Sequence, residues 1–133
     1  MAEVKASDWV DRWKGLTVAC IASGPSLTEE DCEAVHAAGV PTIVTNTSFR
    51  RALWADVLMA FDCRWWTEYH AEVERTFRGA RFACSPNARS LGVPVLFKAS
   101  WFTHFHNSGA SAISLAVVGG AARVVLIGFD CQK

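Results

Sequence analysis

Several groups of small polar residues in this 133-residue chain directly follow an apolar run or begin a segment rich in Gly and Ala. Their members are Ser23, Gly24, Pro25 and Ser26; Asn46; Asp62; Asn107, Ser108, Gly109 and Ala110; and Asp130. Amides and hydroxyls of this kind bind phosphate and ribose, whereas carboxylates suit proton transfer or a magnesium ion. We therefore expect these positions to form a ligand site.

The stretch ACIASGPSLTEED, residues 19–31, supports two interpretations. Ser26-x-x-Glu29 and Thr28-x-x-Asp31 both match a capping box, which would start a helix. A glycine and a proline between strand and cap instead favour a loop whose amides approach an anion closely. The stretch lacks the G-x-G-x-x-G pattern of dinucleotide-binding loops and the G-x-x-x-x-G-K-[ST] pattern of Walker-type loops, so neither kind of binding is indicated. The residues alone therefore favour ligand contact and plain helix capping equally.

His104 and His106 lie just upstream of Ser108, and H-x-H in an extended segment places both rings on one side. One of them suits general acid or base chemistry, because an imidazole titrates near neutral pH. A metal site would need a further ligand, with Asp130 or Cys131 the candidates, so no metal site is predicted. An ordinary surface or core histidine is the structural alternative.

Two further groups of residues have a structural as well as a chemical interpretation. Asp62 and Asp130 would form a carboxylate pair that holds magnesium or takes a proton, or each would simply cap a turn. Of the adjacent Trp65 and Trp66, one would stack on a sugar or a base and at least one belongs to the core, because neighbours on a helix point about 100° apart. Residues 50–51, both arginine, would meet phosphate or stay solvated.

The elements that position these residues alternate along the chain. Strands are predicted at 16–22, 41–46, 56–62, 81–85, 94–98 and 123–130, with helices at 8–14, 28–38 and 63–77, a helical turn at 49–54 and a helix from Ser108. Strands that alternate with helices indicate βαβ units, hence an α/β fold of three layers with a mainly parallel, Rossmann-like sheet. Small residues from Gly109 to Gly120 would let the last helix lie close to the sheet. Ligands of such folds bind at the carboxyl ends of the strands, where all the polar groups above would meet.

Composition excludes several classes of function. Thirteen basic and thirteen acidic residues cancel, which argues against nucleic acid as a partner. No segment reaches the ~18 apolar residues of a membrane span, and the N-terminus lacks a signal-peptide pattern, so a soluble, cytoplasmic chain is expected. Five cysteines without a C-x-x-C pair are expected to stay reduced. The length predicts a single domain over residues 1–133. Six tryptophans indicate either a tightly packed core or an exposed aromatic surface.

Two motifs together resemble a known group of enzymes. IASGPSL after the first strand and NSGASAISLAVVGGAARVVLIGFD near the end are similar to the paired nucleotide-binding motifs of sialyltransferase-type glycosyltransferases. They also resemble those of the archaeal hydroxymethylpterin diphosphokinase-like proteins and of short phage proteins grouped with them. The resemblance implies that Gly24, Pro25 and Ser26 line the phosphate and base pocket, that Asn46 reaches the nucleotide, and that residues 108–110 hold phosphate or ribose.

The resemblance favours a nucleotide-dependent transferase whose donor is a nucleotide sugar such as a CMP-sugar, with no obligatory metal. The alternatives are an ATP-dependent diphosphokinase, which would use magnesium and a small hydroxymethyl acceptor, and a non-catalytic nucleotide-binding module that oligomerises through exposed tryptophans. The resembled families continue past the GFD strand into a segment with a functional histidine, whereas this chain stops at Lys133. We expect a truncated chain, an incomplete site or substitution by another histidine.

Overall fold

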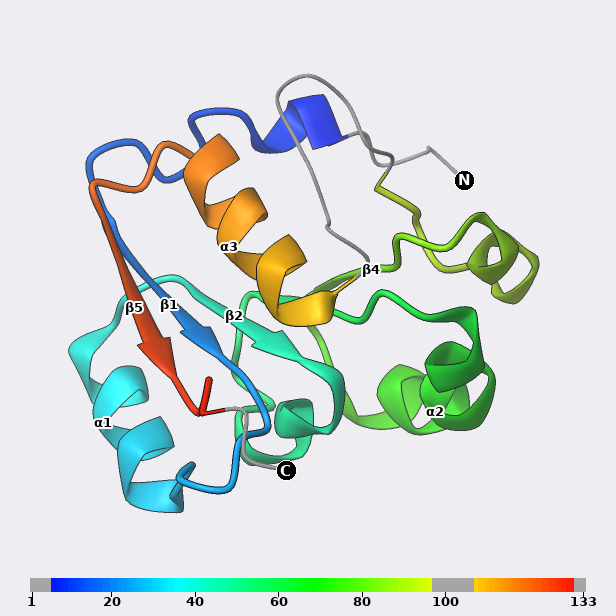
Figure 1. Ribbon diagram of the computed structural model, residues 1–133, viewed down its shortest axis with the longest axis horizontal. Coiled ribbons are helices and arrows are strands. Elements are labelled where there is room, and N and C mark those ends of the chain that lie inside the picture. The colour runs from blue at the N-terminus through cyan, green and yellow to red at the C-terminus, as the bar shows by residue number, and fades with distance from the viewer. Residues whose placement is uncertain (1–5, 97–106, 131–133) are drawn as a thin grey trace.

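The computed structural model describes residues 6–96 and 107–130 and shows an α/β fold of three layers (Figure 1). Five parallel strands form one sheet in the order β4-β3-β2-β1-β5. The strands are β1 Thr17–Ile21, β2 Thr42–Thr45, β3 Val57–Met59, β4 Ala80–Phe82 and β5 Arg123–Ile127. The helices are α1 Glu29–Ala38, α2 Cys63–Thr76 and α3 Ser108–Val118, with 3-10 helices η1 Ala6–Trp9, η2 Asn46–Arg51 and η3 Pro86–Leu91. The predicted fold class is confirmed.

The strand order contains one reversal of direction. From β1 the chain steps through α1, η2 and α2 to β2, β3 and β4, and α3 then returns it to β5 on the other side of β1. Right-handed crossovers place connections that run in opposite directions on opposite faces of the sheet. Accordingly, α1, η2 and α2 pack on one face, and α3 packs on the other, against β1, β2, β3 and β5. The carboxyl ends of β1 and β5 therefore form the topological switch point.

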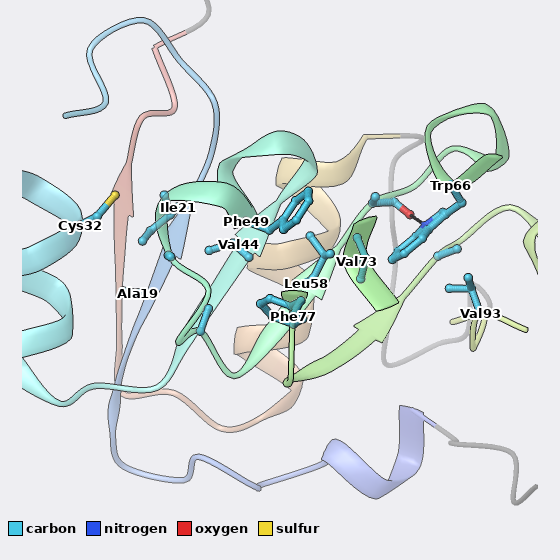
Figure 2. Packing of buried hydrophobic residues seen from close by; sticks show 14 of the residues in the cluster. Ala19, Ile21, Cys32, Val44, Phe49, Leu58, Trp66, Val73, Phe77 and Val93 are labelled. Carbon is cyan, nitrogen blue, oxygen red and sulfur yellow. Dashed lines mark hydrogen bonds between the residues drawn. The ribbon is translucent and has the colours of Figure 1, made fainter. Parts of the chain in front are cut away.

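The two faces of the sheet bury separate apolar clusters because successive strand residues point to opposite sides. Figure 2 shows the first cluster, where Phe49 and Phe77 pack around Leu58 and the Trp66 indole N–H donates to the Ala60 carbonyl at 2.9 Å. In the second cluster Trp9 and Trp13 pack edge-on, with ring centroids 5.4 Å apart, near α3.

The small residues of α3 bring it close to its neighbours, as predicted. Ala112 and Ala116 are fully buried, and a Cβ on Gly119 would overlap the Trp13 ring. Within the described part of the chain, Trp9, Trp13 and Trp66 are buried and Trp54 and Trp65 are partly buried. An oligomer interface of exposed tryptophans is therefore not supported by these five residues; Trp101 lies outside the described residues.

The N-terminal helix predicted at 8–14 is wrong. Only η1 forms, and turns follow it to Gly15, because Asp11 adopts a positive φ of 57°. The amides of Asp11 and Trp13 donate to the carbonyls of Val118 and Gly119 at 3.0 and 2.6 Å. Carbonyls at the end of α3 thus accept hydrogen bonds from the turns that replace the predicted helix.

The strands after α2 are shorter than predicted. A strand was predicted over 81–85, but β4 covers only Ala80–Phe82. The loop predicted at 86–93 contains η3. Of the strand predicted at 94–98, the described residues form a single bridge, between Val95 and Ala83. Strand β5 ends at Ile127 and is an edge strand, with Val125 and Leu126 exposed despite their apolar sequence context.

The four described cysteines form no disulfide. Burial raises the pKa of Cys20 to about 12, and that of Cys84 to about 11. Within residues 6–96 and 107–130, no helix combines the length and the apolar composition needed to cross a membrane.

Candidate functional site

A cavity of about 320 Å³ lies at the switch point, where the loops after β1, β2 and β5 meet the beginning of α3. We name it the switch-point cavity; its lining is Ala22, Ser23, Gly24, Pro25, Thr45, Asn46, Asn107, Ser108, Gly109, Gly128, Phe129 and Asp130. Most of the residues predicted from sequence as a site are thus brought together. Ser26, Ala110 and Asp62 are not part of this lining.

Gly24 is needed where the loop after β1 crosses the end of β5. Its amide donates to the Gly128 carbonyl at 2.7 Å, and a Cβ at this position would overlap that carbonyl and the Asp130 carboxylate. One interpretation of the sequence was that the glycine lets the loop amides approach an anion closely. In the structure the close neighbour is the backbone at Gly128, directly after β5, so the glycine shapes one wall of the cavity.

Asp130 ties the same two loops together through Ser26. The Ser26 amide donates to Oδ2 at 3.1 Å, and the Ser26 hydroxyl donates to Oδ1 at 2.5 Å. The hydroxyl contact is the main reason why the pKa of Asp130 lies below its usual range. The resemblance implied that Ser26 lines the phosphate and base pocket, but its amide and its hydroxyl both donate to a carboxylate instead.

Thr28, rather than Ser26, is the residue that starts α1. Its side chain accepts from the Asp31 amide at 3.1 Å, and Asp31 accepts in return from the Thr28 amide at 3.4 Å. Residues 29–31 place three acidic side chains in the first turn, which suits the positive end of a helix dipole. Of the two capping boxes predicted from the sequence, the one at Thr28 forms. Ser23, Gly24 and Pro25, which precede it, line the switch-point cavity.

A single hydroxyl connects three elements on the opposite wall. Ser108 Oγ donates to Asn46 Oδ1 at 3.1 Å and accepts from the Phe61 amide at 2.9 Å. Asn46 has a φ of 51°, a left-handed conformation that asparagine tolerates better than most residues. The ends of β2 and β3 are thereby joined to the beginning of α3.

The first turn of α3 offers backbone amides to the cavity. Asn107 caps the helix by accepting from the Ala110 amide at 3.0 Å, so this amide is committed. The helical pattern gives the amides of Ser108 and Gly109 no intrahelical acceptor, and both residues line the cavity. These two amides and the helix dipole favour an anion at this wall.

A second, larger cavity of about 780 Å³ adjoins the first and shares Ser23, Asn46, Asn107 and Ser108 with it. We name it the aromatic cavity; its remaining described lining is Thr47, Phe61, Asp62, Trp65, Glu68 and Tyr69. Asp62 caps α2 by accepting from the Arg64 amide at 2.9 Å. Asp62 and Asp130 thus line different cavities.

The adjacent tryptophans have separate roles. Trp66 is fully buried, as expected for at least one of the pair, whereas Trp65 lines the aromatic cavity. The ring of Trp65 packs against Tyr69 with centroids 4.8 Å apart and edge-on against Phe49 at 5.9 Å. Its buried indole N–H has no hydrogen-bond acceptor in the described part of the chain.

The two arginines after β2 behave differently. Arg50 forms two hydrogen bonds of 2.7 Å with Glu72. Arg51 donates to the Leu27 carbonyl at 2.6 Å and lines a third cavity of about 230 Å³, beside Gly24 and Pro25. Among the described residues that line the three cavities, Arg51 is the only Lys or Arg side chain.

His104, His106 and Cys131 lie outside the described residues, so their predicted roles remain predictions. In residues 6–96 and 107–130, no three His, Cys, Asp or Glu side chains are grouped so that they would hold a metal ion. Comparison of the chain with protein-family models, with curated proteins and with solved structures gives no match. The resemblance described above therefore rests on the sequence motifs alone.

Proposed function

We propose that the protein is a nucleotide-dependent transferase that takes a nucleotide sugar, such as a CMP-sugar, as its donor. The observation that carries this proposal is the switch-point cavity, in which Gly24, Asn46 and Ser108 come from three separate elements. Open parallel sheets bind nucleotides at this position, where loop amides and helix N-termini converge. The motif resemblance supplies the class of donor.

The charges around the cavity indicate how such a donor would lie. The Ser108 and Gly109 amides attract an anion, whereas the Asp130 carboxylate on the facing loop repels one. We therefore place the donor phosphate at the α3 wall. The side-chain NH2 groups of Asn46 and Asn107 then remain to donate to the hydroxyls of ribose or the polar edge of the base, since the oxygens of both side chains already accept hydrogen bonds.

Transfer in this proposal needs one bond made, one bond broken and one proton accepted. The acceptor hydroxyl oxygen bonds to the anomeric carbon, the bond from this carbon to the phosphate oxygen breaks, and the nucleotide leaves with the electron pair. The hydroxyl proton passes to a base. Asp62 lines the aromatic cavity and follows Phe61, whose amide donates to Ser108 on the shared wall. Asp62 is the described residue proposed for this role; His104 and His106 are the others.

Binding of the donor is tested by thermal unfolding with CMP, CDP, UDP, ATP and GTP. A nucleotide at one hundred times its Kd stabilises the fold by about 2.7 kcal/mol, or roughly 8–13 °C for a chain of this length. We expect CMP or CDP to give the largest shift, and Ser108→Ala to reduce it. Ser90→Ala is the matched control, because the Ser90 hydroxyl contacts only the Asn87 carbonyl among the described residues.

The same experiment separates the alternatives. A shift that requires both ATP and Mg²⁺ and that CMP cannot compete away would indicate diphosphate transfer instead. If no nucleotide raises the unfolding temperature at millimolar concentration, the proposed function is wrong. Binding without hydrolysis of a CMP-sugar in the presence of acceptors would indicate a nucleotide-binding module.

A further inference from the structure

We propose that the aromatic cavity is an acceptor subsite that takes an uncharged, hydroxylated ring, such as the pyranose of a saccharide. This inference rests on the proposed function, because it assigns the partner of the transfer. The two cavities share Ser23, Asn46, Asn107 and Ser108. A ring seated in the aromatic cavity would therefore lie next to the group that a donor presents across this shared wall.

Helix α2 presents an aromatic surface to the aromatic cavity. Trp65 and Tyr69 are one helical turn apart, and their rings lie 4.8 Å apart at an angle of 33°. Each ring has a further neighbour that restricts it: Phe49 contacts Trp65 edge-on, and the Arg50 guanidinium lies 5.3 Å from the ring centre of Tyr69. A preorganised aromatic surface suits the C–H face of a sugar ring, since little side-chain freedom is lost on binding.

The charged groups of the aromatic cavity favour a ligand without negative charge. Asp62 and Glu68 supply two carboxylates to the lining, and the described lining contains no Lys, Arg or His. Carboxylates accept hydrogen bonds from hydroxyl groups, whereas an anionic ligand between them would be repelled. The aromatic cavity thus disfavours phosphate or a sugar acid, in contrast to the α3 wall of the switch-point cavity.

The polar part of the lining distinguishes a hydroxylated ring from an organic cation, which carboxylates and aromatic rings also attract. Hydroxyls and side-chain amides line the rest of the cavity, from Ser23, Asn46, Thr47 and Asn107. The oxygens of Asn46 and Asn107 already accept hydrogen bonds within the protein, which leaves their side-chain NH2 groups to donate to a ligand. A quaternary ammonium group cannot accept these hydrogen bonds, and burying the donors unpaired is unfavourable. A ring with several hydroxyls donates and accepts at once, so it matches the whole lining.

The test uses the whole chain saturated with CMP and measures binding by calorimetry and by tryptophan fluorescence. The probes are methyl glycosides of glucose, galactose and N-acetylglucosamine, with N-acetylneuraminic acid and tetramethylammonium as the charged comparisons. We expect at least one neutral glycoside to bind at about 10 mM, roughly tenfold more tightly than either charged probe. Tighter binding of a charged probe, or binding of none of the glycosides, would overturn the inference.

Three variants assign the binding to this cavity. Tyr69→Ala removes one ring and is expected to weaken the neutral glycoside roughly tenfold. Trp65→Phe keeps an aromatic ring and is expected to abolish the fluorescence change while calorimetry still detects binding. Glu68→Lys is expected to favour N-acetylneuraminic acid over the neutral glycosides, by reversing the charge. Glu33→Lys on the exposed surface of α1 is the control and should change nothing.

Failure of this inference is distinguishable from failure of the proposed function. If CMP stabilises the chain and no glycoside binds, only the acceptor assignment is wrong. If a glycoside binds at the aromatic cavity and no nucleotide binds at all, the transferase proposal fails and the acceptor assignment fails with it. Unchanged affinity in Tyr69→Ala would place the glycoside elsewhere on the molecule.

Discussion

The two adjoining cavities are built in different ways. Backbone and small side chains at the ends of β1, β2 and β5 form the switch-point cavity, where Gly24 and Gly128 touch directly. Larger side chains of α2, above all Trp65 and Tyr69, form much of the aromatic cavity. The first cavity therefore depends on the fold itself, whereas the second depends on which side chains the helix carries. Substitutions should accordingly affect stability in the first and ligand choice in the second.

Gly24→Val should give the largest effect. The added Cβ overlaps the Gly128 carbonyl and the Asp130 carboxylate, so the two loops must separate and the 2.7 Å hydrogen bond to Gly128 is strained or lost. Overpacking of this kind costs about 1–3 kcal/mol, and we expect the upper part of that range. Urea unfolding monitored by circular dichroism measures it.

Ala37→Val, on the exposed surface of α1, controls for the substitution and should cost only about 0.5 kcal/mol, the difference in helix propensity. An unfolding midpoint of Gly24→Val equal to that of the control would show that the loops have more room than the structure gives them. The description of the switch-point cavity as a wall of tightly packed backbone would then be wrong.

Ser108→Ala should rank second. Its hydroxyl is part-buried and serves both Asn46 and Phe61, so its removal leaves the Phe61 amide without this acceptor. Loss of the partner of a buried amide costs about 1–3 kcal/mol, and we expect the lower part of that range because this hydrogen bond is part-buried. Ser90→Ala, whose hydroxyl is exposed, is the control for this loss of a hydrogen bond. A cost equal to that of Ser90→Ala would contradict the role of the Ser108 hydroxyl in joining the ends of β2 and β3 to the beginning of α3.

Asp130 gives a prediction for pH. Its folded pKa is lowered, chiefly by the Ser26 hydroxyl, so its contribution to stability is complete above the unfolded pKa of about 3.9 and is lost as pH falls through the lower folded value. We expect Asp130→Asn to flatten the decline of stability below about pH 4. Ser26→Ala should raise the pKa of Asp130, as followed by NMR titration of its carboxyl carbon. An unchanged titration would contradict the hydrogen bonds by which Ser26 and Asp130 join the loops after β1 and β5.

Local patterns were sufficient for much of the scaffold. The apolar run before Ser23 and the capping box at Thr28 predicted β1 and α1, because the forces that form these elements act between near neighbours in sequence. The rule that parallel strands end at one edge then gathered most of the predicted polar residues into one cavity.

Contacts between distant residues were beyond sequence reasoning. Ser26 and Asp130 are separated by 104 positions, and each matched an ordinary local role, as cap or as turn residue. The same limit explains β5: its apolar sequence resembles that of a strand covered on both faces, yet Val125 and Leu126 are exposed at the sheet edge. The aromatic cavity had only a partial signal, from Asp62 and the tryptophans that follow it. Placing Glu68 and Tyr69 beside it required the register of α2 against the sheet.

Trp65→Phe should give the smallest change in stability. The indole N–H of Trp65 is buried without an acceptor among the described residues, so replacing the indole removes no hydrogen bond and relieves an unpaired polar group. Part of the ring contact with Phe49 and Tyr69 is lost at the same time, and we expect a net change within about 1 kcal/mol. Thermal unfolding measures the change. A loss as large as that of Gly24→Val would mean that the aromatic cavity supports the fold as much as the switch-point cavity does, and the contrast between a backbone-built and a side-chain-built site would disappear.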